Sequence, residues 1–396
     1  MPSAARPNQI LLLTPREPSF DPRQWFERFE IGVPLRADPW LWSAAAALIL
    51  LGLMMVLNTT YFLGLDKTGN PFYFFERQLF NLGVGLVMMT VAAQLSLRGL
   101  RAIALPLMLM ALLMSLAVWI PGLGIVRGGA RRWVRLGPIL LEPSEMLKLA
   151  TVFFLARYLS HYQEKLGIPK FLLPALAITG VLALIMLKQP DFGAAVMLTL
   201  LLFTMLFAAG AEARHLAAAG GFALLALAIQ AGHKAYRMRR LSAFLDPWRT
   251  ARGSGFQLIQ SFIAFGSGGG WGVGLGASRQ KMFYLPQAHN DFVFAVIGEE
   301  FGVAGALVVI ALFITILIRG MRIARNEADG FGSLLAVGLT ALISLQAFVN
   351  MAVVTGLVPT KGLPLPFLSY GGTSMVVSLT AVGMLMALAR RSVMTR

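Results

Sequence analysis

The chain has 396 residues, of which 57% are hydrophobic and 13% charged, with a formal net charge of +16. Soluble domains carry about 25% charged residues, so this composition indicates an integral membrane protein. Recurring apolar runs of about 20 residues predict transmembrane helices and exclude the alternating pattern of a membrane β-barrel. The chain has no cysteine, which excludes disulfides and thiolate chemistry, and its four histidines form no zinc-binding pair.

The N-terminal tail, residues 1–40, is polar and lacks the apolar core of a cleavable signal peptide. We therefore expect the first membrane span to act as an uncleaved signal. Hydropathy predicts an all-α polytopic membrane domain over residues 41–389, followed by a short tail over 390–396. The ten predicted spans are 41–63, 79–97, 102–120, 144–161, 171–188, 192–210, 216–232, 292–318, 331–355 and 369–389.

An even number of spans places both termini on one side of the membrane. Short loops on that side hold an excess of Lys and Arg once the long segment 233–291 is set aside, so the positive-inside rule predicts cytoplasmic termini. The chain is thus expected to be a multi-pass protein of the cytoplasmic membrane. Two longer loops, 121–143 and 233–291, then face the exported side.

The exported loops are rich in arginine and lysine, against the usual charge bias of exported segments. Contact with anionic lipid headgroups explains this charge, and so does a site for an anionic substrate such as a lipid-linked pyrophosphate. Nucleic acid is excluded as a partner because the charge lies outside the cytoplasm. The candidate cations of a substrate site are Arg131, Arg132, Lys188, Arg237, Arg240 and Lys281.

The sequence EPSEMLKLA, residues 142–150, begins the fourth span with a charged pair. Glu145 and Lys148 are three residues apart and share a helix face. Charges inside a membrane helix are stable only when they pair or face water. The two residues therefore form either a structural ion pair or part of a polar cavity. In KQPDFG, residues 188–193, we expect Asp191 to cap the sixth span.

The segment GSGFQLIQSFIAFGSGGG, residues 253–270, predicts a helix at the membrane interface. Its apolar face would hold Phe256, Ile259 and Ile263, with Ser261 directed away. The following GWGVGLGAS matches a dinucleotide-binding pattern in form, but no strand precedes it and it lies outside the cytoplasm. We reject that function and interpret the glycines as a flexible loop that folds over a substrate.

The stretch YLPQAHNDFVFAVIGEE, residues 284–300, places ionisable groups at both ends of the apolar run that opens the eighth span. Asp291 is either the N-cap of this helix or a catalytic carboxylate. Glu299 would lie about 12 Å deeper on much the same face. There it either binds buried donors, together with Glu300, or lines a polar cavity.

The segment LVPTKGLPLPFLSYGGTSM, residues 357–375, carries three prolines before the last span. It predicts an irregular, re-entrant exported segment. Non-helical backbone at membrane depth requires cover by protein or by a water-filled cavity. We therefore expect a cavity near it, with Ser369 among the residues that line or support this cavity.

Together these motifs resemble the SEDS family (shape, elongation, division and sporulation), of the FtsW and RodA type. The resemblance runs from about residue 128 to residue 376 in family order. It rests on GGARRWVRLG, PSEMLK, QPDFG, YRMRRLSAFLDPW, GSGFQLIQSFIAFGSGG, GVGLGASRQKMFYLPQAHNDFVFAVIGEEFG and NMAVVTGLVPTKGLPLPFLSYGGTSM. The form GLGASRQKMFYLP favours the division-type FtsW branch. The chain departs from the usual pattern at Arg249, Gln287 and Asn290, so no family role is carried over to those positions.

The resemblance implies a ten-span fold and a peptidoglycan glycosyltransferase that polymerises lipid II, with Asp291 as its catalytic residue. Such a carboxylate would act as general base on a sugar hydroxyl. The cations named above would stabilise the leaving pyrophosphate, and the neighbouring His289 is expected to contact substrate. A divalent cation, Mg²⁺ or Mn²⁺, is compatible with this chemistry, although the sequence shows no ligand set for one.

The resemblance also implies a class B penicillin-binding protein as partner, other division or elongation complex proteins, and a place at the division septum. Two alternatives stay open at this point. A cavity with intramembrane charges fits a lipid II flippase equally well, and a non-catalytic scaffold for the transpeptidase is the third possibility.

Overall fold

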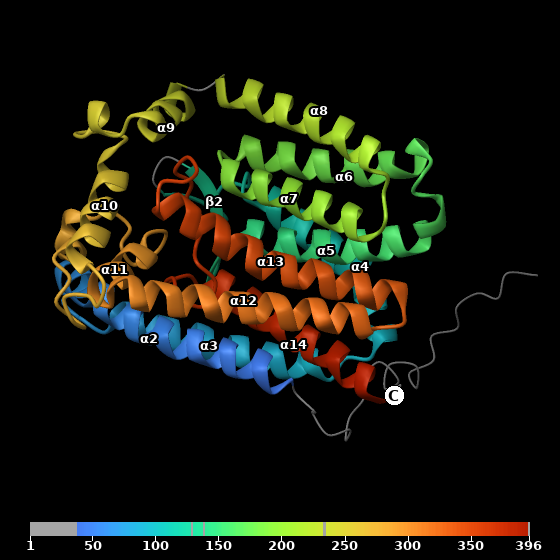
Figure 1. The fold of residues 1–396 in the computed structure, drawn as a ribbon, viewed down its shortest axis with the longest axis horizontal. Coiled ribbons are helices and arrows are strands. Elements are labelled where there is room, and N and C mark those ends of the chain that lie inside the picture. Colours follow the sequence, from blue (N-terminus) through green and yellow to red (C-terminus); the bar gives the residue numbers. More distant parts are fainter. Residues whose placement is uncertain (1–37, 128–129, 138, 233–234, 395–396) are drawn as a thin grey trace, which may run out of the picture.

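The computed structural model describes residues 38–127, 130–137, 139–232 and 235–394 as a bundle of long helices (Figure 1). The predicted N-terminal tail, residues 1–40, therefore lies outside the described residues up to residue 37. The last two residues of the predicted tail 390–396 also lie outside them.

Helices occupy all ten predicted spans. Seven helices of the described chain are long and apolar enough to cross a membrane; α7 is apolar but shorter, and α3 and α5 carry charged residues. The bundle comprises α2 (Pro39–Thr68), α3 (Tyr73–Ala93), α4 (Leu97–Ala117), α5 (Pro143–His161), α6 (Pro169–Lys188), α7 (Phe192–Ala208), α8 (Ala213–Gly232), α11 (Val293–Glu300), α12 (Gly302–Asn326), α13 (Gly330–Val354) and α14 (Gly372–Met394). Shorter elements are η1 (Gln163–Lys165), α9 (Ala235–Leu245), η2 (Trp248–Thr250), α10 (Phe256–Gly268) and η3 (Gln280–Tyr284).

Local sequence explains where the first of these helices begins and ends. The side chain of Asp38 accepts a hydrogen bond from the backbone N–H of Leu41, and Pro39 occupies the first helical position, where its missing N–H costs nothing. Helix α2 ends at Gly69, whose φ of 72° is the left-handed conformation that glycine adopts without strain.

The large loop and a small sheet lie together at one end of the bundle, while the C-terminus lies near the opposite end (Figure 1). We call the first the loop end, which holds residues 124–127, 130–137, 139–141 and 235–291, and the second the tail end. The sheet was not predicted. Strands β1 (Gly124–Arg127), β2 (Ala130–Leu136) and β3 (Ile139–Leu141) pair antiparallel in that order. Alternation along β2 buries Val134 and leaves Arg131 and Arg135 exposed.

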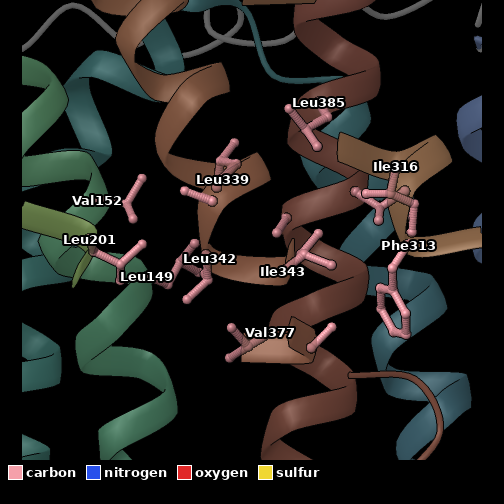
Figure 2. Packing of buried hydrophobic residues seen from close by; sticks show 14 of the residues in the cluster. Leu149, Val152, Leu201, Phe313, Ile316, Leu339, Leu342, Ile343, Val377 and Leu385 are labelled. Atoms are coloured by element: carbon pink, nitrogen blue, oxygen red, sulfur yellow. The ribbon is translucent and has the colours of Figure 1, made fainter. Parts of the chain in front are cut away.

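Helices α13 and α14 form the centre of the bundle. Figure 2 shows Leu339 and Leu342 of α13 directed toward α5 and α7, and Ile343 directed toward α12 and α14. Lipid is as apolar as these side chains, so close packing stabilises the helix contacts. Glycine allows that closeness: at Gly85 in α3 and Gly383 in α14, an added Cβ would collide with the other helix.

The eighth span was predicted as one helix over 292–318, and this prediction is wrong. The helix is interrupted between α11 and α12, where Gly302 has a φ of 66°. Backbone groups of the glycine-rich segment 268–276 replace the interrupted helical hydrogen bonds. The N–H groups of Val273 and Gly274 donate to the last two carbonyls of α11, each at 3.0 Å, and the first N–H groups of α12 donate to the carbonyls of Gly269 and Gly270.

The same contacts correct our interpretation of these glycines as a flexible loop over a substrate. An added Cβ at Gly272 would collide with the backbone of Glu300 and Phe301, and one at Gly268 with the backbone of α11. The glycines are therefore needed for close packing against the helix break.

Helix α10 forms within the predicted interfacial segment. Ser261, which was predicted to point away from the face of Ile263, is buried and its hydroxyl donates to the carbonyl of Val354 at 2.7 Å, whereas Ile263 is exposed. The segment between α13 and α14, residues 355–371, is irregular and largely buried, as the prolines predicted. Helix α14 then begins at Gly372, three residues later than predicted.

Candidate functional site

Asp291 lies at the loop end, just before α11, and does not cap that helix. The N-cap is Phe292, and among the described residues no side-chain hydrogen bond caps α11. The capping role that we considered for Asp291 is therefore wrong. Within the part of the chain that the structure describes, no hydrogen bond reaches the Asp291 carboxylate, so both oxygens stay available to a ligand.

The backbone around Asp291 is held tightly by the irregular segment 355–371. Asn350 of α13 donates from its amide nitrogen to the carbonyl of Asp291 at 2.8 Å and to that of Leu363 at 2.6 Å. Ser369 donates to the carbonyl of Asn290 at 2.6 Å and accepts from the N–H of Leu365 at 2.7 Å. Ser369 thus supports the site through the backbone, and the carboxylate is presented on a rigid frame.

Charged groups from three other segments surround this carboxylate. Burial raises the pKa of Asp291 to about 7; the guanidinium groups of Arg240 and Arg132 oppose the increase, and the carboxylate of Asp191 adds to it. A group that titrates near neutral pH can accept a proton and give it up again during turnover. The site therefore has the charge balance expected of a general base.

Strand β2 and the start of α7 provide two of these groups. Arg132 lies on the face of β2 that also buries Val134, and its guanidinium donates to the carbonyl of Pro190 and lies 3.9 Å from a carboxylate oxygen of Asp191. Asp191 caps α7 as predicted, accepting from the N–H of Ala194 at 3.0 Å. One carboxylate thus anchors a helix and orients an arginine.

Arg240 comes from α9 in the large loop. Its guanidinium donates to the carbonyl of Thr360 at 3.2 Å, which ties α9 to the irregular segment beside Asp291. Two residues along, an added Cβ at Gly362 would lie 2.7 Å from Oδ2 of Asp291. The predicted cations Arg132 and Arg240 are therefore brought together with Asp291 by parts of the chain that are distant in sequence.

The remaining predicted cations are placed differently. Arg131 is exposed on the opposite face of β2 from Arg132, and Lys188 is exposed at the end of α6. Lys281 is buried: its ammonium lies 3.1 Å from a Glu300 oxygen and donates to Asn58 at 2.5 Å. The expected substrate contact of Lys281 is corrected accordingly, because its charge is already neutralised inside the fold. Arg237 belongs to α9, but its side chain lies outside the described residues.

His289 is half-buried against two aromatic rings, Phe74 and Tyr370, with centroid distances of 6.4 and 6.2 Å. Burial lowers the pKa of His289 to about 4, and the charge of Lys67 adds to this decrease. The imidazole is therefore neutral at neutral pH. It can exchange hydrogen bonds with sugar hydroxyls, but it cannot contribute charge to the binding of a pyrophosphate.

The predicted pair Glu145–Lys148 and the predicted partner of buried donors, Glu299, both have structural roles. Lys148 lies 2.8 Å from Glu145 and 2.5 Å from the amide oxygen of Gln346, with both charged side chains at most 4% exposed. Gln346 in turn donates to the carbonyl of Pro364 at 3.0 Å, so this network supports the irregular segment. Glu299 accepts from the hydroxyl of Ser278 and from the N–H of Arg279, as expected for a partner of buried donors.

Sequence reasoning missed two ionisable residues near the site. Glu142 lies just before α5, where burial, followed by the charges of Glu145 and Asp191, raises its pKa to about 8. Its carboxyl is therefore largely protonated at neutral pH. Lys361 lies next to Gly362 in the irregular segment. In the described ranges of the chain, no three His, Asp or Glu side chains are grouped to hold a metal ion.

Replacing Gly362 with Ala should slow a reaction that uses the Asp291 carboxylate, without changing the fold. The new methyl group would lie 2.7 Å from Oδ2 of Asp291, so the carboxylate would have to rotate away. Misplacing a reacting group by about 1 Å can cost about 10²-fold in rate. We expect that loss in the turnover rate at saturating substrate. Gly371→Ala is the control, because its nearest neighbour would lie at 3.7 Å; equal losses in both variants would contradict the close contact with Asp291.

Comparison with known proteins places this geometry in a family. The model of the cell cycle protein family of FtsW, RodA and SpoVE matches residues 39–393. The chain belongs to this family. It is 44% identical over 360 residues to a Geobacter sulfurreducens protein described as a probable peptidoglycan glycosyltransferase FtsW, covering 90% of this chain and 96% of that one. It is 40% identical over 351 residues to stage V sporulation protein E of Bacillus subtilis, covering 87% of this chain and 94% of that one.

Solved structures of the family share the fold. One solved structure comes from work on polymerization and crosslinking by a peptidoglycan synthase complex. It aligns with this chain with a TM-score of 0.74 at 32% identity, covering 91% of this chain and 99% of that chain. The rod shape determining protein RodA of Thermus thermophilus aligns with a TM-score of 0.63 at 26% identity, covering 90% of this chain and 97% of that chain. The helical bundle with its loop end is therefore a SEDS fold.

Proposed function

We propose that this SEDS protein is a peptidoglycan glycosyltransferase of the division type, which polymerises lipid II into glycan strands. The names of its FtsW relatives support the reaction class. One observation carries the assignment of the site. Asp291 is held rigidly beside two arginines, its carboxylate receives no hydrogen bond within the described chain, and its pKa is raised by burial to about 7.

The reaction follows from this arrangement. The carboxylate of Asp291 takes the proton of an acceptor sugar hydroxyl, and the oxygen attacks the anomeric carbon of the donor. The bond from that carbon to the pyrophosphate oxygen breaks, and the lipid pyrophosphate leaves with the electron pair. Arg132 and Arg240 offset the charge that develops on the leaving group, which preorganised cations do at little reorganisation cost. Attack opposite the leaving group inverts the sugar carbon.

The proposed topology places the loop end on the exported face of the cytoplasmic membrane and both termini in the cytoplasm. The positive charge of the short tail-end loops supports this orientation. We further propose a class B penicillin-binding protein as partner, within a division or elongation complex at the septum. The likeness to a structure from a peptidoglycan synthase complex supports such a partner.

A polymerisation assay with the purified full-length protein and lipid II tests the proposal, with and without the class B penicillin-binding protein. We expect glycan strands on a gel, with increased yield when the partner is present. A flippase would instead translocate lipid II across sealed vesicles without forming polymer. A scaffold would form no polymer and would leave cells viable when Asp291 is replaced. Either of these results would overturn the glycosyltransferase assignment.

A further inference from the structure

Lys361 lies at the candidate site without belonging to any of the networks described above. It is half-buried in the irregular segment between α13 and α14, and the next residue, Gly362, lies against the Asp291 carboxylate. The ammonium of Lys361 lies over the ring of Phe192, 4.8 Å from its centroid. Phe192 directly follows Asp191 at the start of α7. The lysine is thus within the same group of segments that surrounds Asp291.

The charge of this ammonium is poorly compensated. The two buried lysines that the structure describes, Lys148 and Lys281, each have a carboxylate partner, Glu145 and Glu300 respectively. In the described residues, the ammonium of Lys361 has no carboxylate within ion-pair distance and no hydrogen bond, only the face of an aromatic ring. Burial lowers the pKa of Lys361 to about 8. Most of it is therefore charged at neutral pH, with three N–H donors left for a ligand.

The other cations of the site are committed to the protein. Arg132 donates to Pro190 and pairs with Asp191, and Arg240 donates to Thr360. A ligand anion must compete with these partners. It meets no such competitor at Lys361, because a ring attracts a cation far less strongly than a phosphate oxygen does.

We propose that Lys361 binds a phosphate oxygen of the donor's lipid-linked diphosphate, and that the ring of Phe192 holds the ammonium while the site is empty. This inference rests on the proposed function. The donor is favoured over the acceptor because the diphosphate leaves from the anomeric carbon that is attacked beside Asp291. The ring under the ammonium of Lys361 belongs to Phe192, which follows Asp191. Asp191 pairs with Arg132, one of the cations that act on Asp291. This places Lys361 beside the cations that would meet the leaving group.

A second ligand would present the same anionic phosphate oxygens to Lys361, namely the phosphodiester headgroup of an anionic phospholipid. Binding measurements on the full-length protein in detergent separate the two. Native mass spectrometry with undecaprenyl diphosphate, and separately with phosphatidylglycerol, compares the wild type with Lys361→Gln and Lys361→Arg. Loss of one charge-assisted hydrogen bond predicts about 10- to 100-fold weaker binding of the diphosphate lipid by the Gln variant. The Arg variant should retain most of the affinity, and phosphatidylglycerol binding should not change.

Lys170→Gln is the matched control. Lys170 also lies over an aromatic ring, 5.0 Å from the centroid of Phe171, but it is exposed at the other end of α6 from Lys188. It should bind the diphosphate lipid as the wild type does. Phe192→Leu should weaken binding only a few-fold, because the ring positions the ammonium without contacting the anion.

Two results would overturn the assignment. One is wild-type affinity of Lys361→Gln for undecaprenyl diphosphate, with unchanged thermal unfolding. The other is an equal loss of phosphatidylglycerol binding, which would identify an anionic lipid site. The lipid II polymerisation assay keeps the two proposals separable: if the wild type forms no polymer, the glycosyltransferase fails, while the binding data still decide the role of Lys361.

Discussion

Replacing Asp291 with Asn should abolish polymerisation of lipid II. General-base catalysis by a positioned side chain contributes typically about 10²–10⁴-fold, and an amide cannot accept the proton at neutral pH. The fold should survive, because in the described chain the carboxylate receives no hydrogen bond, and Asn350 and Ser369 hold only the backbone of this region. Initial rates of glycan formation and thermal unfolding of the same preparations measure the two effects separately.

The pH dependence provides an independent check on Asp291. The general base is active only when deprotonated, and burial raises the pKa of this carboxyl to about 7. The kcat/KM of the wild type should therefore fall about tenfold per pH unit below pH 7 and level off between pH 7 and pH 8. Asp291→Asn should form no measurable polymer at any pH in this range. A wild-type profile that is flat between pH 5 and pH 8 would exclude Asp291 as the base.

A matched control for the charge change is Asp246→Asn. Asp246 also lies in the large loop, where it accepts a hydrogen bond from the N–H of Arg249 at 3.2 Å at the surface. This variant should retain near-wild-type rates. If both Asn variants lost activity equally, the large loop would be sensitive to charge in general, and the special role of Asp291 would be refuted.

The helices were predictable because each span carries its own signal. An apolar run of about 20 residues must satisfy its backbone hydrogen bonds internally, so local composition alone indicates a helix. The sequence gives little indication of the break between α11 and α12. Gly302 lies in an apolar run that contains other glycines, and only the packing of the segment 268–276 against it shows why the helix ends there. The sheet of β1, β2 and β3 was missed because basic residues interrupt its short alternating pattern.

The site was predictable in part. Asp291 could be selected because a carboxylate directly before an apolar run indicates either a helix cap or a functional group. Its catalytic role came from the family resemblance and not from its spacing. The sequence could not show which of the predicted cations lie beside Asp291 and which do not. Arg131 and Arg132 are neighbours, yet strand alternation exposes one and directs the other toward Asp191. Lys281 and Lys361 are both loop lysines, and only the fold shows that the first is neutralised by Glu300 and the second is not.

Replacing Lys148 with Met should have the largest effect on stability. Its ammonium is 1% exposed and lies 2.8 Å from Glu145, which is itself 4% exposed. Removing one partner of a buried pair leaves an uncompensated charge and typically costs about 3–5 kcal/mol. Thermal or denaturant unfolding of the detergent-solubilised protein should show this loss. The surface pair Arg101–Asp329, with side chains 48% and 34% exposed, is the control, and Arg101→Met should cost no more than about 1 kcal/mol.

The double variant Glu145→Gln/Lys148→Met separates the charge from the packing. If the cost of the single variant comes from the stranded carboxylate, neutralising Glu145 should restore most of the lost stability, so that the two substitutions are strongly non-additive. Additive losses would mean that Lys148 stabilises the bundle through its packing or through Gln346 instead. Gln346 bonds the carbonyl of Pro364, two residues from the glycine beside Asp291. Polymerase activity of the double variant should therefore exceed that of Lys148→Met only if the irregular segment returns to its native position. Activity is thus a second measurement of the effect of the buried charge.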